Sequence, residues 1–287
     1  MEKNLTALMC CFVKAYYNLG DGRKIYKDDL SRRLLSDEEY LKIAKSLTDG
    51  IAFFAADFAG DDAAALEWIV ERQLAPSVLA RSAFTHRAIE SEKRLGLRQY
   101  VALAAGYDAE AYRHPDLRCF EIDRGEMIDD KIRRLKNAGI SDAGVRYIRA
   151  DFSCDSDFCK AIDFSEKTLC SLLGLSYYLK SDDFFHLLRT LGASMKRGSA
   201  VVFDYPMRSE TISQEHTRRL AAAAGERMQA KYMPAEIARV LAENDMQIYE
   251  HLSGEEASGQ LFSDYNNATG KQIKAPDDIA YCLAVKY

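Results

Sequence analysis

The sequence lacks three features that would each have assigned it to a large class of proteins. No apolar run approaches the roughly 20 residues of a membrane span. The short N-terminal run LTALMCCFV leads into the polar KAYYNLGDGRKIY, so we expect neither a membrane segment nor a signal peptide. No basic stripe stands out in a chain of net charge -5, which argues against dedicated nucleic-acid binding. We therefore expect a cytoplasmic protein.

Cysteine motifs are missing as well. The cysteines number seven, which is odd, and they form no Cys-x-x-Cys motif. They are Cys10, Cys11, Cys119, Cys154, Cys159, Cys170 and Cys282. This usage predicts the reduced, buried thiols of a cytosolic protein. Cys154 and Cys159 are close enough in sequence for a metal pair, but no histidine-rich segment accompanies them, so we expect no metal site.

Helix signals dominate the first 80 residues. The chain has 287 residues, 48% of them apolar and 29% charged, as in an ordinary globular protein of one or two domains. Ser36 and Glu39 form a capping-box pattern at the start of a helical stretch over 36–58. A second helical stretch over 61–76 is expected to stop at Pro76. Without a convincing strand in this region, residues 1–80 are predicted to form a helical cap.

From residue 100 onward, predicted strands alternate with helices. Short apolar runs predict strands at 100–106, 118–123, 144–151, within 168–179 and at 199–205, with helices at 124–139, 156–164 and 181–198 between them. A helix at 234–245 and strands at 246–252 and 278–287 follow. The alternation predicts an α/β, Rossmann-like domain over 81–287, with a mostly parallel seven-stranded sheet and helices on both faces.

The turn after the first strand is where a sheet of this kind binds its ligand. It reads AAGYDA over 104–109, so only Gly106 remains of the dinucleotide fingerprint Gly-x-Gly-x-x-Gly. Asp108 lies where the loop amides would hold a pyrophosphate, and its charge would repel that group. An NAD(P)-dependent oxidoreductase is therefore the less favoured alternative.

Acidic residues at successive strand ends suit S-adenosylmethionine, which has no phosphate but carries a sulfonium and an ammonium group. Asp108 suits the ammonium group, and Asp123, at the end of the second strand, suits the two ribose hydroxyls. Asp151, at the end of the third strand, suits the adenine amino group. The alternative is that Asp123 and Asp151 only cap the helices that follow them.

Several segments resemble the leucine carboxyl methyltransferase family, whose bacterial members include the polyketide carboxyl O-methyltransferases of tetracenomycin type. These segments are RQYVALAAGYDAEAYR, CFEID, LLGLSYYL and DDFFHLLRTLGASMKRGSAVVFDY, with RSAFTHRAIE and IYKDDLSRRLL ahead of them. The order and spacing of the segments carry the resemblance, which covers about residues 10–205. It implies a class I methyltransferase fold and S-adenosylmethionine as cofactor.

The resemblance also implies roles for individual residues. Arg81 would pair with the methionine carboxylate of the cofactor, although a surface salt bridge is the alternative. Gly106 would line the methionine moiety and Asp108 would face its ammonium group. Asp123 would hold the ribose, and Asp151 with Phe152 would hold the adenine.

Two positions depart from the family pattern. Ala104 replaces the first glycine of the usual Gly-x-Gly turn. Leu173 replaces the glutamate of Glu-Gly-x-x-x-Tyr-Leu, while Tyr178 and Leu179 are kept. That glutamate serves the cofactor and the reaction centre in relatives. A catalytically degenerate protein that only binds S-adenosyl ligands is therefore a second alternative.

The expected reaction is transfer of a methyl group to a carboxylate or hydroxyl of a small-molecule acceptor. A hydroxyl would need a general base, but His86, His114, His186, His216 and His251 are scattered without a pairing that nominates one. Tyr177 and Tyr178 would line the acceptor pocket or else be core aromatics. The N-terminal helices and the segment 206–233 would form a lid over the site.

Overall fold

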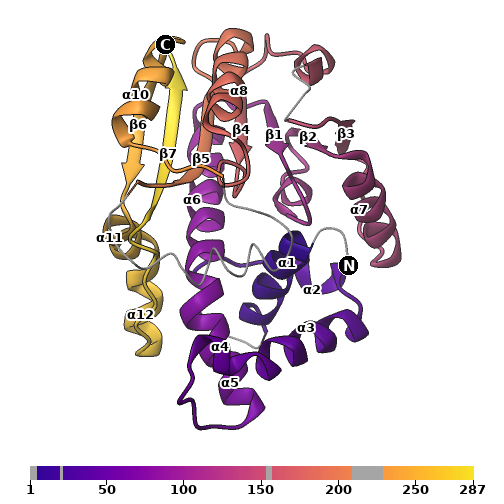
Figure 1. Ribbon diagram of the computed structural model, residues 1–287. Coiled ribbons are helices and arrows are strands. Elements are labelled where there is room, and N and C mark those ends of the chain that lie inside the picture. Colours follow the sequence, from indigo (N-terminus) through magenta and orange to yellow (C-terminus); the bar gives the residue numbers. More distant parts are fainter. Residues whose placement is uncertain (1–4, 20–21, 153–156, 209–228) are drawn as a thin grey trace.

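A seven-stranded sheet forms the centre of the computed structural model, which describes residues 5–19, 22–152, 157–208 and 229–287 (Figure 1). The strand order is β3-β2-β1-β4-β5-β7-β6. The strands are β1 (Gln99–Leu103), β2 (Arg118–Asp123), β3 (Val145–Arg149), β4 (Thr168–Leu172), β5 (Ala200–Pro206), β6 (Met246–Leu252) and β7 (Ile279–Lys286). β7 runs antiparallel to both β5 and β6, while the other pairs are parallel. All seven predicted strands are confirmed.

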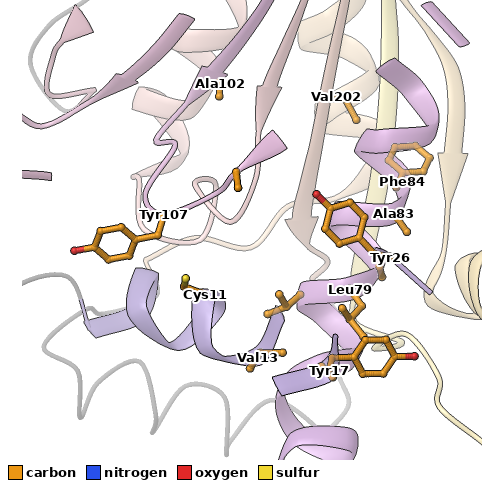
Figure 2. Close-up of a cluster of buried hydrophobic side chains, with 14 of the residues drawn as sticks. Cys11, Val13, Tyr17, Tyr26, Leu79, Ala83, Phe84, Ala102, Tyr107 and Val202 are labelled. Carbon is orange, nitrogen blue, oxygen red and sulfur yellow. The ribbon is translucent and has the colours of Figure 1, made fainter. Parts of the chain in front are cut away.

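Both faces of the sheet are covered, as predicted. Side chains of a strand point alternately to opposite faces, and here alternate residues belong to two separate apolar clusters. Tyr100 and Ala102 of β1 pack with α1 (Leu5–Tyr17) and α6 (Ala75–Arg94). Figure 2 shows this first cluster, with side chains of α1 and α6 gathered at the sheet. Val101 and Leu103 pack on the other face with α8 (Ser181–Ser194) and α10 (Pro234–Ala242).

The N-terminal helices lie beyond the end of the sheet where the parallel strands finish (Figure 1). They are α1, α2 (Ser31–Leu34), α3 (Asp37–Asp49), α4 (Ile51–Phe54), α5 (Asp62–Ile69) and the π-helical turn η1 (Val70–Leu74). The predicted capping box is present, because Ser36 accepts from the Glu39 amide and Glu39 accepts from the Ser36 amide. The helical stretch over 36–58 breaks at Gly50, however, and resumes only as the short α4.

The sequence predicted that the second helical stretch ends at Pro76, and this prediction is wrong. Pro76 lies in the first turn of α6, where a proline is tolerated because the missing amide hydrogen would have no acceptor. The chain therefore passes from α5 through η1 into α6 as one nearly continuous helical segment. The expected boundary at residue 80 falls inside α6.

The remaining elements follow the prediction with two differences. α7 (Gly125–Asn137) connects β2 to β3 as expected, whereas the expected helix at 156–164 is only the short 3-10 turn η3 (Asp157–Ala161). The final two strands are separated by a helical excursion that the sequence analysis missed. It contains α11 (Gly254–Ala257), the turn η5 (Ser258–Phe262) and α12 (Ser263–Thr269), and it begins with a capping box of Ser253 and Glu256.

In the parts of the chain described by the structure, no helix is both long and apolar enough to span a bilayer. The six cysteines in those parts are free thiols, and Cys11, Cys119, Cys170 and Cys282 are buried. Cys154 of the weighed metal pair lies outside the described residues.

Candidate active site

A cavity of about 1120 Å³ lies between the carboxyl ends of the parallel strands and the N-terminal helices. All the residues that the sequence nominated for the site line it. They are Arg81, Ala104, Gly106, Asp108, Asp123, Asp151, Phe152, Leu173, Tyr177 and Tyr178. Ligands of open α/β sheets bind at this edge, next to the strand where the order reverses. That strand is β1, whose following turn forms one wall.

The turn after β1 is held in a left-handed backbone conformation. Ala104 has φ +52° and Gly106 has φ +49°. The Gly106 amide donates to Asp123 Oδ2 at 2.8 Å, and the Arg124 amide donates to Oδ1 at 2.8 Å. Burial raises the pKa of the Asp123 carboxyl, while these two amides act to lower it. Asp123 thus joins the first turn to the end of β2.

Asp108 forms an ion pair with Lys14 of α1, a contact that the sequence analysis did not foresee. Its second oxygen, Oδ1, accepts from the Glu110 amide at 2.8 Å. Burial acts to raise the pKa of Asp108, but the charge and hydrogen bond of Lys14, together with the Glu110 amide, lower it, and the net shift is downward. The carboxylate is therefore ionised and is already shared with one ammonium group.

Arg81 of α6 reaches the turn after β4. Its Nη2 donates to Cys10 Sγ at 3.0 Å, and its Nη1 lies 3.8 Å from Asp204 Oδ2. Gly174 has φ +66°, and a methyl group built on it would lie 2.6 Å from Arg81 Nη1. The surface salt bridge considered as an alternative for Arg81 is absent among the described residues, since Asp204 is 1% exposed.

Asp204 on β5 contacts the same turn after β4. Its carboxylate accepts from the Gly174 amide at 2.7 Å and from the Tyr177 hydroxyl at 2.8 Å. Tyr177 is buried, whereas Tyr178 is half-buried and packs at 6.3 Å from the Tyr177 ring. Tyr177 thus combines a core position with a place in the cavity wall, and its contact with an acceptor stays a prediction.

The third strand end contributes the outer wall. Asp151 is exposed at the rim of the cavity, and Phe152 next to it makes an edge-on ring contact with Phe158 at 5.6 Å. An exposed carboxylate beside an aromatic side chain could present an acceptor and a flat surface to a planar ring.

The N-terminal helices complete the cavity with apolar and basic side chains. Ile43, Leu47 and Phe54 come from α3 and α4. Basic lining residues are Lys14, Lys42, Arg72, Arg81, Arg124 and Lys274. Among the described residues that line the cavity, none is a histidine. This part of the wall suits an anionic molecule with an apolar body.

The histidines lie elsewhere. His186 is exposed on α8, and His251 Nε2 shares a hydrogen bond of 2.7 Å with the Tyr205 hydroxyl. His216 lies outside the described residues. His86 and His114, which the sequence did not show to be paired, both contact Glu110 in the structure. The i,i+4 spacing of Glu110 and His114 was the available signal.

The sequence analysis missed Lys14 and Asp204 as site residues. Each carried the same signal, which is a single charged residue inside a run expected to be buried: LMCCFVKAYY for Lys14 and AVVFDY for Asp204. Such residues are almost never fully buried unless they are paired. The partner of each comes from a distant part of the chain, however, so the sequence did not show what they contact.

The fold and the cavity together define the class of protein. This strand order, with an antiparallel seventh strand and a ligand cavity at the carboxyl edge, is the class I S-adenosylmethionine-dependent methyltransferase fold. The model of the family described as leucine carboxyl methyltransferase matches residues 7–192. The chain belongs to the leucine carboxyl methyltransferase family, and it is an S-adenosylmethionine-dependent methyltransferase.

Similar proteins agree with that assignment. A Bacillus subtilis (strain 168) protein named "Putative S-adenosyl-L-methionine-dependent methyltransferase YktD" is 32% identical, over 99% of this chain and 98% of its own length. Two solved structures share the fold. A DUF574 family protein from Streptomyces avermitilis has a TM-score of 0.61 at 14% identity, covering 96% of this chain and 97% of that one. A Thermobifida fusca YX protein described as a "putative methyltransferase" has a TM-score of 0.58 at 18% identity. The match covers 84% of this chain and 94% of that one.

Proposed function

We propose that this protein transfers a methyl group to an oxygen of a small-molecule acceptor, a carboxylate in preference to a hydroxyl. The observation that carries the preference is the composition of the acceptor end of the cavity. Its described wall offers no histidine, and it brings Lys42, Arg72 and Lys274 beside apolar side chains. A carboxylate is already ionised at neutral pH and needs no base, whereas an aliphatic hydroxyl usually does.

We further propose that the nominated residues hold the cofactor. Asp123 takes the ribose hydroxyls, and Asp151 with Phe152 takes the adenine. Arg81 takes the methionine carboxylate, because its guanidinium lies at the turn where that end of the cofactor belongs and suits bidentate pairing. Gly106 lines the methionine chain. Asp108 faces the cofactor ammonium and shares its carboxylate with Lys14.

The residues of the chain fit this cofactor in two respects. The turn after β1 offers a carboxylate and no glycine-rich anion cradle, which matches a ligand with an ammonium group and no phosphate. The cavity is also large enough for a nucleoside and a second molecule, since small-molecule sites occupy about 300–1,000 Å³.

When bound, S-adenosylmethionine supplies a methyl group on a sulfonium, which an oxygen attacks in line. The protein contributes position and charge in this scheme. Arg81 and Asp123 fix the donor, and basic residues elsewhere in the cavity wall orient the acceptor oxygen towards it. The N-terminal helices over the cavity exclude water from the reacting atoms.

We assign residues 1–80 to a cap that shapes the acceptor pocket and residues 81–287 to the catalytic domain. The cap side chains in the cavity wall support this division, since they supply much of its apolar surface. Most of the expected lid segment 206–233 lies outside the described residues.

A degenerate binding protein is the second candidate, because Leu173 stands in the cavity wall where relatives carry a glutamate. The backbone conformation of the turns after β1 and β4 argues for activity. Gly174 keeps its left-handed conformation, and Ala104 adopts the left-handed backbone that a glycine would take there. The two departures therefore leave the shape of both turns in place.

Calorimetric titration with S-adenosylhomocysteine tests the cofactor site. Micromolar binding by the wild type, lost in Asp123→Ala and kept in Asp129→Asn, supports it. Asp129 is the matched control, because it is an acid on α7 that pairs with Arg149 outside the cavity. Absence of binding by the folded wild type contradicts the proposal.

A transfer assay then tests the acceptor class. Labelled S-adenosylmethionine is incubated with apolar carboxylic acids and with the alcohols of the same skeletons. Esters formed from the acids alone support a carboxylate acceptor. Ethers formed from the alcohols contradict that preference, and binding without transfer to any acceptor in a broad panel favours the degenerate protein.

A further inference from the structure

A second cluster of polar side chains is buried beside the cavity and does not line it. Glu110, in the turn η2 (Glu110–Arg113), is 3% exposed, and His114 directly after it is also 3% exposed. Glu110 Oε1 lies 2.6 Å from His86 Nδ1 and 2.8 Å from His114 Nε2. His86 comes from α6, so two elements distant in sequence converge on one carboxylate oxygen.

The spacing of the three side chains can be compared with that of a metal site. One ligand atom from each of the three residues lies within 4.8 Å of the other two. Zinc bonds to nitrogen and oxygen are about 2.0–2.2 Å, so the ligand atoms of a tetrahedral site are about 3.4 Å apart. Closing or opening these contacts by less than about 1.5 Å would admit an ion. Two imidazoles and one carboxylate are also a zinc ligand set known from other proteins.

The surroundings include a group that orients one ligand. Glu90 Oε1 lies 3.7 Å from His114 Nδ1, the ring nitrogen that faces away from Glu110. Metal-bound histidines usually direct this second nitrogen to a carboxylate or carbonyl, which fixes the tautomer. The Tyr26 hydroxyl donates to Glu110 Oε2 at 2.5 Å, so Oε1 is the oxygen that faces the two histidines.

Charge balance permits a divalent cation. The two imidazoles contact Glu110 Oε1, and Oε2 is left to Tyr26 and Arg113. Among the residues that the structure describes, Arg113 is the arginine or lysine that pairs with Glu110, with Nη1 at 3.9 Å from Oε2. That guanidinium also lies over the Tyr26 ring and donates to the Lys27 carbonyl, and it can keep both contacts when an ion enters on the Oε1 side.

We propose that His86, Glu110 and His114 bind one divalent transition-metal ion of the zinc type. The site is structural. It joins α6, the β1–β2 connection and, through Tyr26, the segment that follows α1. It is also linked to the main cavity, because the Glu110 amide donates to Asp108 Oδ1 at 2.8 Å. The ion would hold in place the loop that presents Asp108 to the cavity.

Metal titration of the full chain after chelator treatment tests the site. Zn²⁺ is followed by calorimetry, and Co²⁺ by the visible absorption bands that appear when it is bound in tetrahedral geometry. We expect one ion per chain at micromolar affinity or better, and weakening by about 100-fold or more in His86→Ala, because outer-shell changes alone already cost 10–100-fold. His86 is partly exposed, so the variant should fold.

His186→Ala is the matched control, since it removes an exposed histidine far from the cluster, and it should bind as the wild type does. Zn²⁺ should also raise the melting temperature of the wild type and of this control but not that of His86→Ala. If the wild type shows no saturable binding, or if His86→Ala binds equally well, the proposal is overturned and the cluster is a hydrogen-bond network only.

Discussion

The guanidinium of Arg81 lies directly against the α-carbon of Gly174. A methyl group on Gly174 would stand 2.6 Å from Arg81 Nη1, closer than such atoms approach, and 3.2 Å from its Cζ, which is tighter than an ordinary contact. This residue of the turn after β4 is therefore a glycine for two reasons. It has a φ of +66°, and its missing side chain leaves the space that the arginine fills.

Gly174→Ala should displace Arg81 and weaken the binding of S-adenosylhomocysteine, measured by calorimetry, by about tenfold or more, equivalent to about 1.4 kcal/mol. The control is Gly139→Ala. Gly139 has a similar φ of +63°, but an added methyl group meets nothing within 4 Å. Both variants should lose about 1–2 kcal/mol of stability through backbone strain. Equal binding by both would show that Arg81 does not hold the cofactor.

Tyr177→Phe should lower the free energy of unfolding by about 1–3 kcal/mol, because it leaves a buried oxygen of Asp204 without one of its donors. Tyr281→Phe is the matched comparison. The hydroxyl of Tyr281 is buried without a partner among the described residues, so its removal should be neutral or slightly stabilising. Denaturant unfolding measures both. A Tyr177→Phe protein as stable as Tyr281→Phe would contradict the role given to Asp204.

Ala104→Gly should leave the protein at least as stable as the wild type, and up to about 1 kcal/mol more stable. Relief of the left-handed strain at Ala104 exceeds or balances the entropy cost of a glycine. Ala105→Gly makes the same chemical change one residue later, outside the positive-φ region, and should cost about 0.5–1 kcal/mol. Thermal unfolding measures the stability of both variants. An equal loss of stability in the two would contradict the strain at Ala104.

The ion pair between Glu39 and Arg134 should make attachment of the cap to α7 sensitive to acid. Hydrogen bonds from Arg134 at 2.6 and 2.8 Å lower the pKa of Glu39 from 4.5 to about 2. Because the folded pKa is the lower one, the stabilisation is complete above pH 4.5 and is lost as the pH falls through about 2.

Glu39→Gln should therefore lose stability relative to the wild type above pH 4.5, and the difference should shrink as the pH falls towards 2. Denaturant midpoints measured across that range give the result. Glu38→Gln, which removes an exposed acid from the same helix turn, is the control and should show a smaller difference. A gap between Glu39→Gln and wild type that stays constant with pH would contradict the ion pair.

The sequence by itself determined the sheet. The central strands are nearly continuous apolar runs, as expected for strands buried on both faces, whereas the edge strands β3 and β6 mix apolar with polar residues. All seven were predicted because turn or helix signals bound them. The sequence also predicted the site residues at the strand ends. Carboxyl ends of parallel strands meet at one edge, so Asp123, Asp151 and Gly106 had to come together once the strands were assigned.

Only the tertiary structure decided the contacts between segments far apart in the chain. Lys14 and Asp108 are 94 residues apart, and Asp204 and Gly174 are 30 apart. Burial demands a partner for each charge, but it does not specify which residue supplies it. For the same reason, the sequence did not show that His86 and His114 converge on Glu110. Local sequence patterns predict secondary structure and strand ends. Which side chains meet is set by the packing of α1 and α6 on the sheet.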